Sequence, residues 1–256
     1  MEPAHAKTKS RLKGSYGLDA PYLLPIPLII VVWNVVRGIM SWTLWPFVAA
    51  AIVAVCMGCG LFTSRRGKFI VWAELLDELR LRGNERILDV GCGRGAVLLM
   101  AAKHLTTGRA VGIDLWKRQD QSGNCAEATL GNATAEGVAD RVELRTADMT
   151  LLPFEDNSFD FVLSNVAIHN VKSRDGRQKA IEQAVRVLRP GGRLLIADIR
   201  ATGEYLKRFV DLGMISITRR NLGWRMWWSG PWLPTHLVTA LKPSPRDSSD
   251  TVRGIR

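Results

Sequence analysis

Residues 88–95 read LDVGCGRG, a short apolar stretch that runs into a glycine-rich turn at the start of a helical pattern. Glycine permits positive φ and a close approach of the main chain to a ligand, and the next helix adds a positive partial charge at its N-terminus. The turn therefore predicts a nucleotide-like ligand. Alone it is ambiguous, because Gly91, Gly93 and Ala96 also satisfy the dinucleotide pattern G-x-G-x-x-G/A, with Asp114 near the distance expected of a ribose-binding acid.

Helix and strand patterns alternate around this turn. Apolar residues at helical spacing predict helices at 69–79, 96–104, 124–136 and 181–188. Strand patterns cover 86–90, 110–114, 142–147, 159–164 and, after a break at Arg189-Pro190-Gly191-Gly192, 193–198. This βαβ repetition predicts an α/β fold with a doubly wound, mostly parallel sheet that has helices on both faces.

Polar residues follow the ends of the predicted strands. The carboxyl ends of parallel strands meet at one edge of the sheet, where ligands of such folds bind. Any one of these residues could be a helix cap or a turn residue. Together they predict one site, and they are Asp89 with Gly91, Asp114, Asp148, Asn165 and Asp198.

A nearly continuous apolar region extends from Tyr22 to Phe62 and has Arg37 as its single charge. Residues 42–62 are long enough for one membrane-spanning helix, whereas 22–36 are fewer and include two prolines and an asparagine. A cleaved signal peptide is the alternative, but the apolar region far exceeds a signal core. We expect one or two transmembrane helices retained as an anchor.

The charge distribution predicts the orientation and the partners. Basic residues precede the apolar region and follow it directly, which places both of its ends in the cytoplasm. The net charge of +11 is concentrated in the N-terminal leader and in residues 219–256, while the centre is nearly neutral. This suits an anionic membrane surface better than a phosphate groove, so we expect membrane lipid and no nucleic acid as a partner.

The four cysteines, two of them inside the apolar region, form no disulfide framework or zinc spacing, and the histidines show no ligand spacing. We therefore expect that the protein binds no metal and that its cysteines face a reducing cytosol. The chain divides into a basic cytoplasmic leader (1–20), transmembrane segments (21–64), a folded domain (65–242) and a disordered tail (243–256). Since every site motif lies beyond residue 87, we expect residues 1–64 to anchor the protein without forming the ligand site.

The domain resembles class I S-adenosylmethionine-dependent methyltransferases, in particular the small-molecule (type 11) group related to the ubiquinone-biosynthesis and arsenite enzymes. The resemblance covers about residues 70–242 and is carried by LDVGCGRG (88–95), GID (112–114), AD (147–148), LPFEDNSFDFV (152–162) and LRPGGRLLIAD (188–198). Nicotinamide-binding domains lack the acid at Asp89 and the later motifs. The resemblance implies a seven-stranded Rossmann-like sheet with an antiparallel final strand near 235–241, and the chain departs from the pattern at 116–123.

The resemblance also implies S-adenosyl-L-methionine as the cofactor and suggests how it is bound. Gly91, Gly93 and Gly95 would contact its methionyl and ribose portion. Asp114, with Leu115 beside it, would accept hydrogen bonds from the ribose hydroxyls. Such charge-assisted bonds are worth about 1.5–3 kcal/mol each.

The remaining site residues surround the ends of the cofactor. By the same resemblance, Asp148 and Met149 would flank the adenine, Asp89 would face the methionine amino group and Asn165 would lie beside the transferable methyl. His169 is either a general base that takes a proton from the acceptor or a structural histidine bonded to backbone. We favour the structural role, since many family members work by holding acceptor and sulfonium in line.

These observations predict a membrane-anchored methyltransferase that faces the cytoplasm and methylates a small, lipophilic acceptor on O, S or N. A protein or nucleic-acid methyltransferase is the alternative, although Ser-Asn-Val-Ala after the fourth strand lacks the N-P-P-[YF]-like motif of base methyltransferases. A non-catalytic, cofactor-binding membrane module is another. The tryptophans at 224, 227, 228 and 232 form either an interfacial belt, which we favour, or an aromatic lid over an apolar substrate.

Overall fold

The computed structural model describes residues 13–244 and contains one seven-stranded sheet in the order β3-β2-β1-β4-β5-β7-β6. The strands are β1 (Arg86–Val90), β2 (Arg109–Asp114), β3 (Val142–Thr146), β4 (Phe159–Asn165), β5 (Leu188–Asp198), β6 (Ile215–Asn221) and β7 (His236–Leu241). β1 to β5 pair in parallel, and β7 runs antiparallel to both of its neighbours. This confirms the predicted sheet with its antiparallel final strand.

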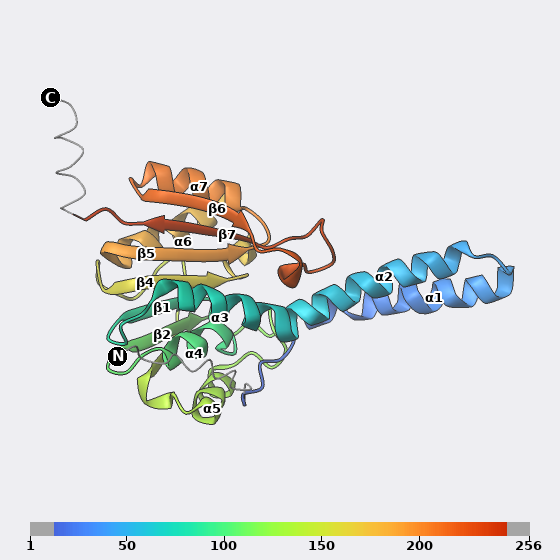
Figure 1. Ribbon diagram of the computed structural model, residues 1–256, viewed down its shortest axis with the longest axis horizontal. Helices are drawn as coiled ribbons and strands as arrows, with labels where there is room; N and C mark the ends of the chain where they lie inside the picture. The colour runs from blue at the N-terminus through green and yellow to red at the C-terminus, as the bar shows by residue number, and fades with distance from the viewer. Residues whose placement is uncertain (1–12, 245–256) are drawn as a thin grey trace, which may run out of the picture.

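Helices cover both faces of the sheet (Figure 1). One face carries α3 (Lys68–Leu79), α4 (Ala96–Lys103) and α5 (Ala126–Glu136), and the other carries α6 (Arg174–Val187) and α7 (Thr202–Asp211). Neighbouring residues of a strand point to opposite faces, so Ile87 packs in the first core and Leu88 in the second. The continuously apolar strands thereby fill two cores, as a doubly wound fold requires.

The Arg-Pro-Gly-Gly segment lies inside β5, whereas the sequence pattern predicts that it precedes the strand. Leu188 pairs with Phe159, and the register then shifts so that Arg193 pairs with Phe161. Gly191 has a φ of 78°, and a Cβ on Gly192 would lie 2.8 Å from the carbonyl oxygen of Asp160. The two glycines therefore let the strand bulge and resume pairing, where the sequence pattern predicts a break.

A helical hairpin made of α1 (Pro25–Ser41) and α2 (Trp45–Phe62) projects away from the sheet and its helices (Figure 1). By length and composition, Pro21–Ser41 and the helix that begins at Trp45 could each cross a membrane. Only 6% and 17% of their apolar windows are buried, so they are not the core helices of the domain. The first of them is longer than predicted, because its two prolines stand in the opening turn of α1, where a missing N–H costs nothing.

The second hairpin helix continues into the domain. A π-helical turn, Thr63–Gly67, joins α2 to α3, so one 35-residue helix runs from Trp45 to Leu79. At this turn the Thr63 hydroxyl donates to the carbonyl oxygen of Trp227 at 2.6 Å, and a Cβ on Gly67 would overlap the carbonyl oxygen of Arg225. The loop before β7 is thus seated on the base of the hairpin.

Residues 13–20, which we predict to belong to a leader, pack on the domain instead. Tyr16 is only 7% exposed and its hydroxyl donates to Glu136 at 3.0 Å, while Asp19 forms an antiparallel bridge with Gln121. The folded unit therefore includes chain on both sides of the hairpin and does not begin at residue 65. Residues 1–12 of the predicted leader, and the predicted disordered tail from 245 onward, lie outside the described residues.

Candidate active site

The glycine-rich turn connects β1 to α4 at the centre of the sheet. The order in which successive strands are added reverses here, between β1 and β4. Gly91, Gly93 and Gly95 all have positive φ, at 75°, 50° and 84°, and Gly95 is the N-cap of α4. A Cβ on Gly93 would lie 2.6 Å from the side-chain oxygen of Gln121. The turn therefore requires glycine for its conformation and, at position 93, also for space.

Asp114, at the end of β2, is bonded to this turn. Its Oδ2 accepts from the Gly93 N–H at 2.9 Å, and its Oδ1 accepts from the Trp116 N–H at 2.6 Å. Asn124 adds a longer contact of 3.3 Å from its side-chain amide. Within the described part of the chain, Oδ2 has a single donor and therefore a second lone pair, so Asp114 can still accept from a ligand. Leu115 follows it with 44% of its surface exposed.

Asp89 is buried behind the turn, and its Oδ1 has no hydrogen-bond partner among the described residues. Burial raises the pKa of this carboxyl to about 7; the charge of Asp114 adds to the increase and the Leu98 backbone opposes it. An unpartnered buried acceptor is costly, and a cationic or hydrogen-bond-donating ligand group would remove that cost. This orphaned oxygen fits the methionine amino group that the sequence resemblance implies.

Asp148 and Met149 follow β3 at the same edge. Asp148 Oδ1 accepts from the backbone N–H and the hydroxyl of Thr150, both at 2.8 Å, and these bonds lower the pKa of this exposed carboxyl. Met149 reaches the glycine turn, because its Cε lies 3.6 Å from the position of a Cβ on Gly91. An apolar side chain and a carboxylate thus stand side by side near the turn.

Asn165 ends β4, and its Oδ1 accepts from the indole N–H of Trp72 at 2.8 Å. Trp72 is fully buried on α3, the continuation of the hairpin helix. The next residue, Val166, has a φ of 52°, which is an outlier for a β-branched side chain, and its N–H donates to Ala197 at 2.7 Å. Such strain is characteristic of functional sites, and here it turns the chain sharply after Asn165.

His169 lies in a short 3-10 turn beyond Val166 and contacts Asp198 at the end of β5. Its backbone N–H donates to Asp198 Oδ2 at 3.1 Å, and its Nδ1 lies 2.6 Å from Asp198 Oδ1, within ion-pair distance but off hydrogen-bond geometry. Asp198 is fully buried and also accepts from the Ile199 N–H and the Tyr205 hydroxyl. The histidine side chain retains 15% exposure.

The structure therefore brings all the predicted site residues to one edge of the sheet. Sequence reasoning missed three side chains that support them: Trp72 on Asn165, Tyr205 on Asp198, and Gln121, whose Oε1 accepts from the Arg94 N–H at 2.8 Å. Trp72 belongs to an ordinary apolar helix pattern, and the other two lie where no motif extends. Their roles depend on contacts between segments that are far apart in the chain.

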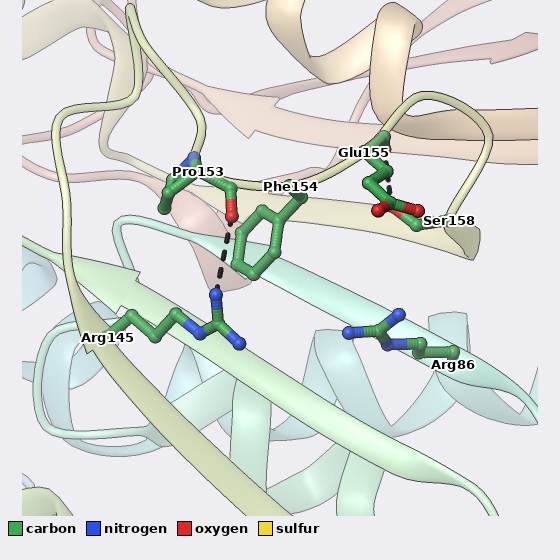
Figure 2. Close-up of a pocket in the computed structure, with 6 residues that line it drawn as sticks. All are labelled: Arg86, Arg145, Pro153, Phe154, Glu155 and Ser158. Atoms are coloured by element: carbon green, nitrogen blue, oxygen red, sulfur yellow. Dashed lines mark hydrogen bonds between the residues drawn. The ribbon is translucent and has the colours of Figure 1, made fainter.

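A separate hollow of about 260 Å³ contains none of the predicted site residues. Figure 2 shows the guanidinium groups of Arg86 and Arg145 on either side of Phe154, below the loop that precedes β4. Within residues 13–244, no group of three or more His, Cys, Asp or Glu side chains is placed to hold a metal ion.

Comparisons with known proteins relate this fold and this edge to methyltransferases. Residues 88–196 match the family model described as a methyltransferase domain. Among curated proteins, the chain is 36% identical over 130 residues to the methyltransferase GfsG of Streptomyces halstedii, covering 51% of this chain and 43% of that protein. It is 34% identical to the ubiquinone/menaquinone biosynthesis C-methyltransferase UbiE of Roseobacter denitrificans, covering 50% and 48%.

Residues 88–196 are therefore similar to methyltransferase domains. The match spans less than half the length of these two relatives.

Solved structures confirm the fold. A geranyl diphosphate methyltransferase in complex with GPP and sinefungin superposes with a TM-score of 0.54 at 20% identity, covering 66% of this chain and 76% of that one. The [4+2]-cyclase SpnF superposes with a TM-score of 0.55 at 21% identity, covering 67% and 80%. Since the same fold occurs in a protein named as a cyclase, the site and not the fold must carry the functional argument.

The buried Asp89 predicts a pH dependence of stability. Because its pKa is about 7 in the folded protein and 3.8 as a free group, the folded state binds more protons between these values, and stability falls as pH rises through this window. We expect the cofactor-free protein to lose about 2–4 kcal/mol between about pH 5 and pH 8, and Asp89→Asn to remove most of that slope.

Chemical denaturation at several pH values measures this slope. Asp148→Asn is the matched control, because a carboxyl with a lowered pKa stays ionised across the window and its loss leaves the slope unchanged. Equal slopes in the parent and in Asp89→Asn would contradict the assignment of the titration to Asp89.

Proposed function

We propose that this protein transfers a methyl group from S-adenosylmethionine to a small, lipophilic acceptor at the cytoplasmic face of a membrane. The observation that carries the proposal is the orphaned oxygen of Asp89 beside the glycine turn, in a chain whose residues 88–196 match a methyltransferase family model. The cofactor supplies a methyl group made electrophilic by the adjacent sulfonium. The protein has to bind it, orient it and present the acceptor in line.

Different residues at this edge of the sheet contact different parts of the cofactor. Asp89 accepts from the methionine ammonium, which removes the cost of its unpartnered oxygen. Asp114 accepts from the ribose hydroxyls while it holds Gly93, and Leu115 covers the same side. The backbone of the glycine turn passes close to the methionyl and ribose portion because its three glycines present no side chain.

Asp148 and Met149 are suited to the adenine. The methionine offers a flexible apolar surface to the face of the ring, and the Asp148 segment offers hydrogen-bonding groups to its edge. Asn165 comes next along the edge, and its side-chain oxygen is already held by Trp72, so its amide N–H₂ is oriented in advance toward the region of methyl transfer.

His169 is our candidate base. Asp198 holds the His169 backbone and lies within ion-pair distance of Nδ1, an arrangement that orients the imidazole and leaves Nε2 as the atom that can take the proton the acceptor loses. This contact favours the base role over the structural role that we infer from sequence. Asn165 precedes His169 by four residues, and the strained turn at Val166 lies between them.

The hairpin supports attachment to a membrane. Its large apolar side chains are exposed, and so are Arg65 and Arg66 at its base. Trp224 and Trp232, in the loop before β7, are 61% and 65% exposed. Trp224 stacks on Phe62 at 5.2 Å between ring centroids. Tryptophan and arginine at the end of an apolar helix are typical of the interface between acyl chains and headgroups, with the positive charges on the cytoplasmic side. This favours the interfacial belt over the aromatic lid.

The names of the relatives bear on the acceptor. They include a ubiquinone/menaquinone biosynthesis C-methyltransferase and a sterol 4-C-methyltransferase, and also a 27-O-demethylrifamycin SV methyltransferase. Carbon therefore joins O, S and N as a possible acceptor atom, which the sequence interpretation had left out. A small apolar acceptor partitions into a membrane, where the hairpin would concentrate the enzyme.

Calorimetry tests the cofactor assignment. Asp114→Ala is expected to weaken S-adenosylmethionine binding by about 1.5–3 kcal/mol, the worth of a charged hydrogen bond. The control is Asp140→Ala, an exposed carboxylate paired with Arg141 outside the site, which should leave binding unchanged. Tight binding of NADH together with no binding of S-adenosylmethionine would refute the proposal.

Kinetics test the role of His169. If His169 is the base, His169→Ala should lower kcat by about 10²–10⁴ and leave cofactor affinity unchanged. Higher pH should then partly rescue the activity toward a thiol or phenol acceptor. His104→Ala, at the C-cap of α4, serves as the control. A structural histidine behaves differently: thermal stability and cofactor binding fall together, and kcat per folded molecule stays within a few-fold of the parent.

Two equally exposed valines test the membrane anchor. Val55 lies in α2 with 67% exposure, and Val210 lies on α7 with 66%. Arginine near the centre of a spanning helix costs about 2.5–3.5 kcal/mol on insertion scales, so Val55→Arg should reduce the fraction that resists carbonate extraction from membranes, and Val210→Arg should not. Complete extraction of the parent protein would show that the hairpin does not span.

A further inference from the structure

Asp19 stands at the base of the hairpin and joins its two ends. It lies two residues before the short turn Pro21–Leu23 that leads into α1, and its Oδ2 accepts from the Ser64 hydroxyl and from Lys68 Nζ, both at 2.7 Å. Ser64 lies in the π-helical turn after α2, and Lys68 opens α3 with only 2% of its side chain exposed. A buried ammonium needs such a partner, so the position of Asp19 is strongly determined.

The other oxygen of Asp19 faces the glycine turn. Asp19 Oδ1 accepts from Gln121 Nε2 at 3.0 Å, and Gln121 Oε1 accepts from the Arg94 N–H at 2.8 Å. Gln121 is 8% exposed, and a carboxylate can only accept, so Asp19 selects the amide orientation in which the oxygen faces Arg94. Arg94 is the residue between Gly93 and Gly95.

Backbone pairing holds this chain of contacts in register. Ala20 N–H donates to Asp120 at 2.9 Å and Ser122 N–H donates to Leu18 at 2.9 Å, on either side of the bridge between Asp19 and Gln121. The segment 116–123, where the sequence departs from the family pattern, is therefore the surface on which the N-terminal segment docks. From the sequence we expect residues 1–64 to anchor the protein without forming the ligand site, and the structure shows that this segment contacts a residue bonded to the glycine turn.

We propose that Asp19 is a positioning residue for the cofactor site: through Gln121 it fixes the Arg94 N–H of the glycine turn, and through Ser64 and Lys68 it fastens that turn to the base of the hairpin. The inference rests on the proposed cofactor site and adds a specific requirement. The chain that precedes the hairpin has to be docked for the glycine turn to hold its binding geometry.

Gln121→Ala tests this in the full-length protein, because it cuts the link to the turn and leaves the contacts among Asp19, Ser64 and Lys68 in place. Without cofactor, hydrogen exchange of the peptide that covers residues 91–95 should accelerate about tenfold, the equivalent of one lost hydrogen bond. S-adenosylmethionine should bind about 5–15 times more weakly, and kcat at saturating cofactor should stay unchanged.

Tyr16→Phe is the matched control. It removes a hydrogen bond that fastens the same N-terminal segment to Glu136, and it leaves in place both Gln121 and the Asn132 side chain that bridges Ser15 and the Arg94 carbonyl. It should lower thermal stability and leave both the exchange of residues 91–95 and the cofactor affinity as in the parent. A merely structural role for Gln121 would make the two variants behave alike, which would overturn the inference.

A double-mutant cycle tests the place of Asp19 in the chain of contacts. Since Asp19 acts through Gln121, adding Asp19→Asn to Gln121→Ala should weaken cofactor binding no further than Gln121→Ala alone. Additive effects would show that Asp19 acts by another route. If the parent protein binds no S-adenosylmethionine, the proposed function fails, and the exchange measurement without cofactor still decides whether Gln121 holds the turn.

Discussion

The hydrogen bond from the Gly93 N–H to the Asp114 carboxylate ties together the ends of two adjacent parallel strands, and the rest of the site is arranged around it. It sets the turn between β1 and α4 against the end of β2, at the point of the sheet where strand order reverses. With both strands buried, their carboxyl ends leave a single open edge. Each further polar residue, Asp89, Asp148 or Asn165, reaches that edge because its own strand ends there.

A continuous helix connects the hairpin to the domain. A single helix from Trp45 to Leu79 enters the domain through a π-helical turn, carries Lys68 to Asp19 and then carries Trp72 to Asn165. A helix rotates by about 100° per residue, so the extra residue of a π-turn changes which side chains face the sheet beyond it. The hairpin helix thereby contacts both Asp19, which is linked to the glycine turn, and the end of β4, at the edge where we propose that the cofactor binds.

Prediction from the sequence was strongest where local chemistry determines conformation. The bounds of β1 agree to the residue, and those of β2, β4 and α4 agree to within one, because buried strands and the glycine turn impose their own patterns. Prediction failed at Arg-Pro-Gly-Gly, where β5 continues through two glycines because its pairing partners on both sides hold it. It also placed residues 13–20 in a leader, since a short polar stretch shows no sign of the surface on which it docks.

The sequence by itself determined the class of fold, the edge of the sheet that carries the proposed site and the polar residues at that edge, because periodicity and glycine placement are local properties of the chain. Tertiary structure alone decided which side chains support those residues. Gln121 on Arg94, Trp72 on Asn165 and Asp198 on His169 are contacts between segments that meet only after folding. Hydrogen-bond partners distant in sequence leave no pattern in a single chain, since each partner alone has an ordinary local explanation.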